Sequence, residues 1–169
     1  MAGTKVKVKI AWGKKEKKLS IKIGAKTLGG ALKELLRLDE WGDFHGDIAY
    51  VYRADANNHV TEVTLKPSYT IQMPTWAGYS KAPKACQQEW SRMWKKLEEH
   101  ENGHRDIHLK ALTAIQNALA KKTDLTVDQL ESDFARMMKE AQDKQDKFDN
   151  STGHGSNKGV ELNIAKECE

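Results

Sequence analysis

The stretch WSRMWKKLEEHENGHRDIH, Trp90 to His108, decides the fold class because it joins a helical repeat to a cluster of histidines. Apolar residues recur at every third or fourth position, and the repeat extends from about Lys84 to Ala118. This spacing predicts one long amphipathic helix. The segment HENGH in its middle fits the pattern H-E-x-x-H, which is typical of zinc sites with an adjacent general base.

The spacing inside the motif gives each residue a distinct role. Residues four apart on a helix lie on one face with Cβ atoms about 5–6 Å apart, so His100 and His104 can share one zinc ion. Glu101 lies beside the pair, where it can take a proton from the water that zinc activates. The alternative is that all three are ordinary polar residues of a surface helix. Against it, His100 and His104 lie in the apolar stripe, where core is expected, and buried polar groups need partners such as a metal. Gly103, inside the helix, predicts the close approach of another group.

The third ligand must come from outside a straight helix. His108 lies about 9 Å further along the axis than a metal shared by the pair, which is beyond the reach of an imidazole, so it is expected to flank the site. His154, between two glycines, is the preferred candidate, because glycines let a loop approach a site. Asp149 is the alternative, as a ligand or as an acceptor for a ligand histidine, and His154 would then be an ordinary loop residue. The two remaining histidines lie in turn-like contexts and are expected to be structural or exposed: His45 and His59.

The first half of the chain is rich in strand patterns. Residues 5–12 (KVKVKIAW) and 18–23 (KLSIKI) alternate polar and apolar positions, and the connector GKKEK between them predicts a hairpin. Residues 26–38 predict a short helix. Residues 47–56 (DIAYVYRADA) and 60–73 (VTEVTLKPSYTIQM) predict a second pair of strands joined by the turn ANNH.

The second half is predicted to be helical. Residues 75–82 (TWAGYSKA), between Pro74 and Pro83, predict a surface loop that leads from the strands to the long helix. Thr126 and Gln129 form a capping box that begins a second helix, which continues toward Phe148. A glycine-rich loop follows Asn150.

The order of elements predicts an α+β fold: N-terminal antiparallel strands with a short helix, then two long helices, the first a zincin-like HExxH helix. The length fits one domain, residues 1–169, with strands in 1–82, helices in 83–150 and a metal-binding loop and tail in 151–169. The last apolar segment, VELNIA, is predicted to form a strand or a helical turn.

The charge distribution and the two cysteines indicate which binding partners and which cellular compartment suit this chain. Residues 1–37 carry eleven Lys or Arg against two Glu, a basic face that can contact acidic surfaces; its alternation is that of a solvated strand face, so nucleic acid is not the favoured partner. No apolar run is long enough to span a bilayer. Cys86 and Cys168 either pair in an oxidising compartment or remain as two buried thiols.

Three segments together carry a resemblance to a known family: MPTW, EWSRMWKKLEEHENGH and FDNSTGHG. Residues 27 to 159 resemble a family of predicted bacterial secreted zinc-dependent proteases that is classified as a domain of unknown function. The most specific parts are W-x(5)-HE-x-GH, from Trp94 to His104, and D-x-x-T-x-HG, from Asp149 to Gly155.

The resemblance implies zinc on His100 and His104, Glu101 as general base and His154 as third ligand. It also implies a secreted or periplasmic location, although the segment MAGTKVKVKI lacks the apolar core of a signal peptide. Phe148 departs from the family, in which a tyrosine is expected at this position.

The sequence therefore predicts a zinc metallopeptidase acting on peptides or proteins. An extended substrate would lie along a strand edge, with DIAYVYRA or YTIQM as candidates, and Tyr69 or Tyr79 would stabilise the oxyanion unless they are packing residues. One alternative is a non-enzymatic binding module that uses the basic hairpin, with a structural zinc closed by Asp149. Another is an effector or toxin protease delivered into another cell.

Overall fold

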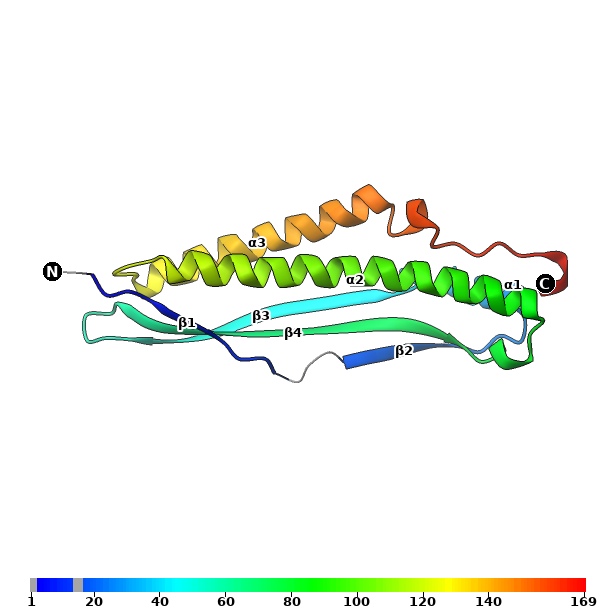
Figure 1. Ribbon diagram of the computed structural model, residues 1–169, viewed down its shortest axis with the longest axis horizontal. Helices are drawn as coiled ribbons and strands as arrows, with labels where there is room; N and C mark the ends of the chain where they lie inside the picture. The colour runs from blue at the N-terminus through cyan, green and yellow to red at the C-terminus, as the bar shows by residue number, and fades with distance from the viewer. Residues whose placement is uncertain (1–2, 14–16) are drawn as a thin grey trace. The chain divides into compact units, whose positions relative to one another are not determined.

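The computed structural model describes residues 3–13 and 17–169 and has the predicted α+β class, with strands first and long helices second (Figure 1). Its strands are β1 (Lys7–Ile10), β2 (Lys17–Ile23), β3 (Asp43–Ala54) and β4 (Val60–Trp76). Its α-helices are α1 (Leu28–Leu35), α2 (Lys84–Ala120) and α3 (Val127–Thr152). Three short 3-10 turns complete it: η1 (Tyr79–Lys81), η2 (Ser156–Lys158) and η3 (Lys166–Cys168).

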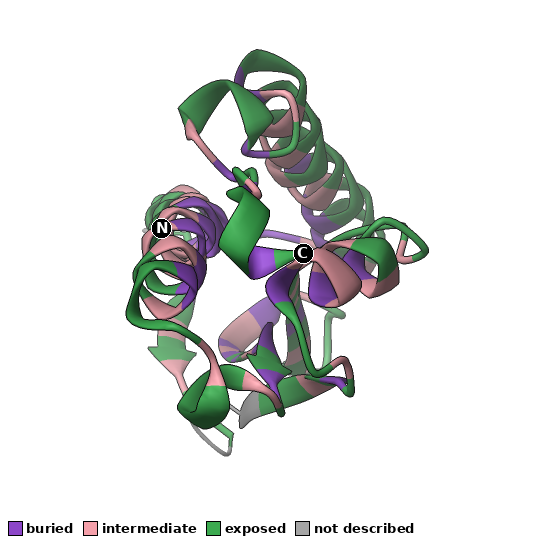
Figure 2. Ribbon diagram, turned by 90° about the vertical axis from the view of Figure 1, so that its right-hand side faces the viewer, coloured by how far each residue is buried: buried purple, intermediate pink, exposed green. Residues whose placement is uncertain are grey.

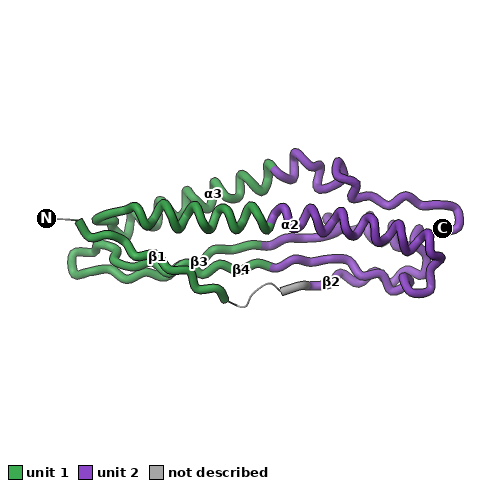
Figure 3. The backbone as a smooth tube through the Cα atoms, in the orientation of Figure 1, with its two compact units in different colours: residues 1–16, 46–69, 105–147 green, residues 17–45, 70–104, 148–169 purple. Residues whose placement is uncertain are grey.

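The chain is organised in two compact units, each made of three separate segments (Figure 3). Unit 1 comprises the described parts of residues 1–16, 46–69 and 105–147. Unit 2 comprises residues 17–45, 70–104 and 148–169. The elements β3, β4, α2 and α3 each contribute residues to both units. The whole H-E-x-x-H motif, Asp149 and His154 belong to unit 2.

The sheet is organised around β4, and the predicted N-terminal hairpin is wrong. β1 pairs in parallel with β4 from Lys7 opposite Glu62, and β2 pairs in parallel with it from Lys17 opposite Thr70. β1 and β2 are therefore not paired with each other among the described residues. Alternation identifies a half-buried strand but carries no information about a partner some fifty residues later. Residues 14–16 of the predicted connector lie outside the described part of the chain.

The second pair of strands is confirmed. β3 pairs with β4, and the connection through residues 55–59 is too short for anything but an antiparallel hairpin. The side chain of Asp55 accepts hydrogen bonds from the backbone N–H groups of Asn57 and His59, at 2.9 Å each, which closes the turn.

β4 is longer than predicted. It continues through Pro74 to Trp76, so the predicted surface loop begins only at Ala77 and contains η1. The candidate substrate strand YTIQM lies within β4, where β2 pairs with it from Thr70 onward. YTIQM is therefore not a free edge. The prediction that an extended substrate lies along a strand edge now applies to DIAYVYRA in β3, which pairs with β4.

Unit 1 is stabilised by one apolar cluster. Its buried members come from the residue before β1, from β3, β4, α2 and α3, and from the connection before α3: Val6, Ile48, Val60, Val63, Leu65, Leu112, Ile115, Leu119, Leu125, Leu130, Phe134 and Met137. The capping box before α3 is confirmed, because Gln129 N–H donates to Thr126 Oγ1 at 3.3 Å and Thr126 N–H donates to Gln129 Oε1 at 3.1 Å. These bonds satisfy N–H groups that the helix itself leaves without acceptors.

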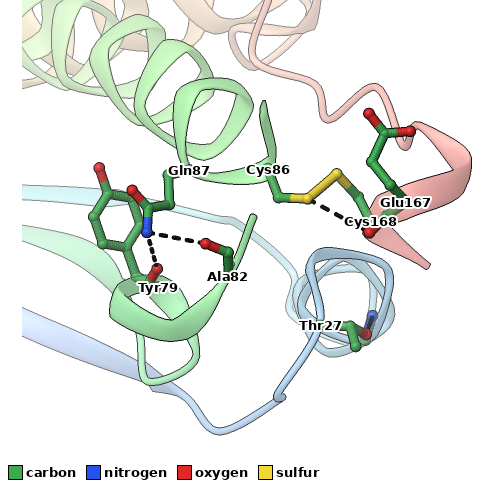
Figure 4. Close-up of a disulfide and its surroundings, with 8 residues drawn as sticks. Thr27, Tyr79, Ala82, Cys86, Gln87, Glu167 and Cys168 are labelled. Atoms are coloured by element: carbon green, nitrogen blue, oxygen red, sulfur yellow. Dashed lines mark hydrogen bonds between the residues drawn. A yellow bond between two sulfur atoms is a disulfide. The ribbon is translucent and has the colours of Figure 1, made fainter. Parts of the chain in front are cut away.

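Unit 2 is tied together by a disulfide between Cys86, in the first turn of α2, and Cys168, in η3 (Figure 4). This resolves the two alternatives for the cysteines in favour of pairing. The predicted short helix α1 is confirmed, with Thr27 Oγ1 accepting from Gly30 N–H at 3.1 Å. α1 buries Leu28, Ala31 and Leu35.

The C-terminal segment is held along α2 without regular structure. Arg92 donates to the carbonyl oxygens of Gly159, at 3.0 Å, and Glu161, at 2.8 Å. Val160 and Leu162 are nevertheless buried, as is Cys168. Figure 2 colours the ribbon by burial and shows buried stretches (purple) alternating with exposed ones (green). VELNIA forms neither the predicted strand nor a helical turn; the carbonyl of Glu161 and the N–H of Asn163 bond instead to the side chains of Arg92 and Glu89 of α2.

Candidate metal centre

Two histidines one turn apart on α2 form the centre of the site. His100 and His104 are both buried, and their Nε2 atoms are 3.3 Å apart. The pKa of His100 is lowered by burial and then by the neighbouring His104, while Asp149 opposes the shift. Burial therefore favours the neutral imidazole, the form that binds a metal.

Asp149, in the last turn of α3, completes a group of three donors. Its Oδ1 lies 2.8 Å from His104 Nε2 and 3.3 Å from His100 Nε2. The helix continues past Asp149 to Thr152, whose hydroxyl donates to the carbonyl of Phe148 at 2.8 Å. α3 thus extends two residues beyond the predicted end at residue 150, and Asp149 lies in its last turn beside the histidines.

The three donor atoms fit a tetrahedral metal. A zinc ion with bonds of about 2.0–2.1 Å separates its ligand atoms by about 3.3–3.4 Å. Two of the three separations are 3.3 Å, and the third, 2.8 Å between His104 and Asp149, has the length of a hydrogen bond in which His104 donates. The ligand atoms of His100, His104 and Asp149 all lie within 4.8 Å of one another, so the group can hold a metal ion.

His154 lies beside this group but is largely exposed. Its Nδ1 is 3.8 Å from Asp149 Oδ1, and 65% of its side-chain surface is accessible. Gly153, His154 and Gly155 all have positive φ angles, of 56°, 51° and 86°. This left-handed run explains the glycines on both sides of the histidine. Asp149 is thus the third donor that the structure brings together, and ligation by His154 stays a prediction.

Glu101 is almost fully enclosed, with 3% of its surface exposed. Burial, and after it the nearby carboxylates of Glu40, Asp43 and Asp149, together raise the pKa of its carboxyl to about 8. A Cβ atom added at Gly42 would lie 2.7 Å from Glu101 Oε1, so Gly42 provides the space that this side chain occupies. The protonated acid is favoured near neutral pH unless a cation binds beside it.

Aromatic rings enclose the two histidines. Phe148 is stacked on His100, with ring centroids 5.1 Å apart, and presents its edge to His104 at 4.9 Å. Phe44, in β3, is stacked on His104 at 6.1 Å. A Cβ atom at Gly103 would overlap the ring of Phe148. The close approach predicted from Gly103 is therefore confirmed, and its partner is Phe148.

Two contributors to the site had no clear signal in the sequence: Phe44 and Gly42. Both come from the segment that begins β3, whose contact with α2 is not encoded in local spacing. For Phe148, the only signal in the sequence is its departure from the family pattern.

The other candidate residues lie elsewhere. His108 belongs to unit 1, where its ring meets the edge of Tyr69 at 6.1 Å, and it is not among the three grouped donors. Tyr79 shares a hydrogen bond of 2.9 Å with Ser91. A role of Tyr69 or Tyr79 in stabilising the oxyanion stays a prediction. His45 is exposed, and His59 closes the β3–β4 turn, as expected.

Comparison with known proteins gives one match. A family described as bacterial protein of unknown function (DUF922) matches residues 27–155. No curated protein and no solved structure matches the chain. Among the described residues, no helix combines the length and apolar character needed to cross a membrane. Because the match covers most of the chain and includes all the residues of the candidate metal centre, this protein belongs to the DUF922 family of bacterial proteins of unknown function.

Proposed function

We propose that this protein is a zinc-dependent metallopeptidase in which His100, His104 and Asp149 hold the metal. The observation that carries the proposal is the convergence of two buried imidazoles and a carboxylate at separations close to those of a tetrahedral ion. Two histidines and one carboxylate form a donor set of catalytic zinc sites, which keep one position open for water. Asp149 remains partly exposed, so the site has access to solvent.

The chemistry divides between the metal and Glu101. When bound, zinc would lower the pKa of a water molecule and polarise the carbonyl of the substrate. Glu101 accepts the proton of the attacking water and makes it available to the amide nitrogen that leaves when the C–N bond breaks. Its enclosed position supports this role, because a carboxylate in a poorly solvated site is a stronger base than one in water.

The first test combines metal content with hydrolysis. Glu101→Gln should retain zinc, measured by elemental analysis, and should lower hydrolysis of an unstructured protein by about 10²–10⁴-fold. Glu99→Gln is the matched control, since Glu99 is on the same helix and half exposed, and should leave both properties unchanged. Undiminished hydrolysis in Glu101→Gln, or no zinc in the parent chain, would contradict the proposal.

His154 favours a second candidate, a structural zinc in a binding protein. If its Nδ1, 3.8 Å from Asp149 Oδ1, joined the other donors, the ion would have four protein ligands. Structural zinc sites are closed in this way and leave no position for water. This alternative rests on the fourth donor, because β1 and β2, the strands of the predicted basic hairpin, each pair with β4 and not with each other among the described residues.

Substitution of His154 separates the two candidates. In a catalytic site with three ligands, His154→Ala should lower zinc affinity by less than about 10-fold, whereas loss of a fourth ligand should lower it more than about 100-fold. Titration against a chromophoric zinc chelator gives the affinity. A large loss of affinity, together with no hydrolysis in the parent, would identify the site as structural.

The disulfide supports a location outside the reducing cytoplasm. Cystine pairs persist in secreted and periplasmic proteins and are rare where thiols are kept reduced. We therefore propose that the protein works in an oxidising compartment. Labelling of free thiols in protein isolated from its native cell would show two reactive cysteines if this is wrong.

A further inference from the structure

An acidic segment borders the candidate metal centre. Residues 39–43, DEWGD, carry three carboxylates and no Lys or Arg. Asp39, Glu40 and Asp43 are all exposed, whereas Gly42 between them is buried. The segment is thus buried at Gly42, whereas its three carboxylate side chains are exposed to solvent.

The segment runs along the motif face of α2. A Cβ atom at Gly42 would lie 3.0 Å from Leu97 Cδ1 and 2.7 Å from Glu101 Oε1. Two residues later, Phe44 is stacked on His104. The carboxylates of Glu40 and Asp43 therefore flank the point at which the segment meets the general base.

The acids of this region are not paired with a lysine or arginine in the described part of the chain. No described Lys or Arg forms an ion pair with Glu40, Asp43 or Glu101. Glu101, which is 97% enclosed, has neither a hydrogen bond nor an ion pair among the described residues, and its Oε1 faces Gly42. The pKa of Glu40 is raised by partial burial and then by Asp43 and Asp149, while His154 and His104 oppose the shift. A cation supplied from outside the chain would relieve the repulsion between Glu40 and these two carboxylates.

We propose that Glu40 and Asp43 form a subsite for a cationic nitrogen of the peptide substrate, an inference that rests on the proposed peptidase function. Exposed carboxylates beside a reaction centre accept charge-assisted hydrogen bonds from an ammonium or guanidinium group. Such pairs determine which substrate is selected more than how tightly any substrate binds. The nitrogen belongs either to a Lys or Arg side chain near the cleaved bond or to the free amino terminus of the peptide.

The test measures binding rather than hydrolysis. The zinc-loaded chain carrying Glu101→Gln, in which cleavage is suppressed, is titrated with three peptides by calorimetry. The first is acetyl-Ala-Ala-Lys-Ala-Ala-amide, the second has norleucine in place of lysine, and the third is the norleucine peptide with a free amino terminus. The same titrations are repeated after Glu40→Gln with Asp43→Asn, and after Glu99→Gln with Asp106→Asn, a control with the same change in net charge at exposed acids of α2.

The lysine peptide or the free-amine peptide should bind about 5–10-fold more tightly than the acetylated norleucine peptide, and whichever does so identifies the source of the nitrogen. The preference should fall below about twofold in Glu40→Gln with Asp43→Asn and persist in the control. Equal affinity for all three peptides, or a preference that survives loss of Glu40 and Asp43, would overturn the proposal. So would a second zinc ion per chain that is lost with these acids.

Cleavage assays on the parent chain keep the two proposals distinct. If the cationic peptide binds selectively but is never hydrolysed, the subsite stands and the peptidase function fails. If neutral and cationic peptides are cleaved equally and bind equally, the peptidase function stands and the subsite fails.

Discussion

Units 1 and 2 solve the problem of a stable interior in different ways. The interior of unit 1 is a cluster of twelve buried apolar residues. Unit 2 contains four of the five buried polar or charged residues of the described chain, namely His100, Glu101, His104 and Thr152. Buried polar groups oppose folding unless they find partners, so unit 2 requires more compensation than unit 1, in which His108 is the buried polar residue. The disulfide and the proposed metal add to the apolar side chains that unit 2 also buries, among them Leu28, Trp90 and Met93.

The sharpest test of this contrast compares two buried histidines of α2, His104 in unit 2 and His108 in unit 1. His104→Ala should lower zinc affinity by more than about 100-fold, because it removes a ligand. His108→Ala should change it by less than about threefold, since His108 is outside the donor group. Competition with a chromophoric chelator measures both. Similar losses in the two variants would mean that the metal site is not confined to unit 2.

Loss of the disulfide should be the next largest effect. The bond closes a loop with a sequence separation of 82 residues, so Cys86→Ser with Cys168→Ser should lower the free energy of unfolding by about 3–4 kcal/mol. Urea denaturation measures the change. Hydrogen exchange should accelerate in residues 159–168 before it accelerates in the apolar cluster of unit 1. Faster exchange in unit 1 first would show that the disulfide supports both units equally.

A core truncation should break unit 1 while sparing the metal centre. Leu119 is fully buried, and Leu119→Ala should cost about 2–4 kcal/mol of unfolding free energy. Leu36, which is 67% exposed, is the control, and Leu36→Ala should cost less than about 0.5 kcal/mol. Zinc affinity of the folded Leu119→Ala protein should equal that of the parent. A fall in zinc affinity in this variant would show that the interiors of the two units are energetically coupled.

A smaller effect is expected where Gly103 meets Phe148. Gly103→Ala gains about 1 kcal/mol of helix propensity but forces the ring of Phe148 to move, for a net loss of about 1–2 kcal/mol. Combining it with Phe148→Leu should recover most of this loss, because the smaller side chain leaves room for the new methyl group. A double-mutant cycle on urea midpoints gives the coupling, and additive effects would contradict the contact.

Local patterns predicted much of this structure because their causes are local. The apolar period of α2, the capping box at Thr126 and the turn between β3 and β4 all involve residues within a few positions of one another. The partner of β1 was mispredicted for the opposite reason. Parallel pairing with β4 depends on a strand about fifty residues away, and strand alternation is equally compatible with a hairpin.

The candidate metal centre was likewise predictable only where its geometry is local. The i, i+4 spacing fixed the meeting of His100 and His104, because a helix determines that geometry alone. Whether Asp149 or His154 completes the group depends on where α3 ends, and helix ends are the least predictable part of a helical pattern. A longer predicted α3 would have favoured Asp149 as the third donor. No local sequence pattern would have predicted the contact of Phe44 with the site.

The three-segment make-up of each unit has a practical consequence for dissecting this protein. No single cut in the chain releases either unit, because the three segments of each unit are separated in the sequence by segments of the other. Deletion from either end removes a strand or a tail from one unit and leaves that unit incomplete. Function is therefore better mapped by point substitutions in the intact chain than by expressing fragments, and recombination between relatives should succeed only when all three segments of a unit are exchanged together.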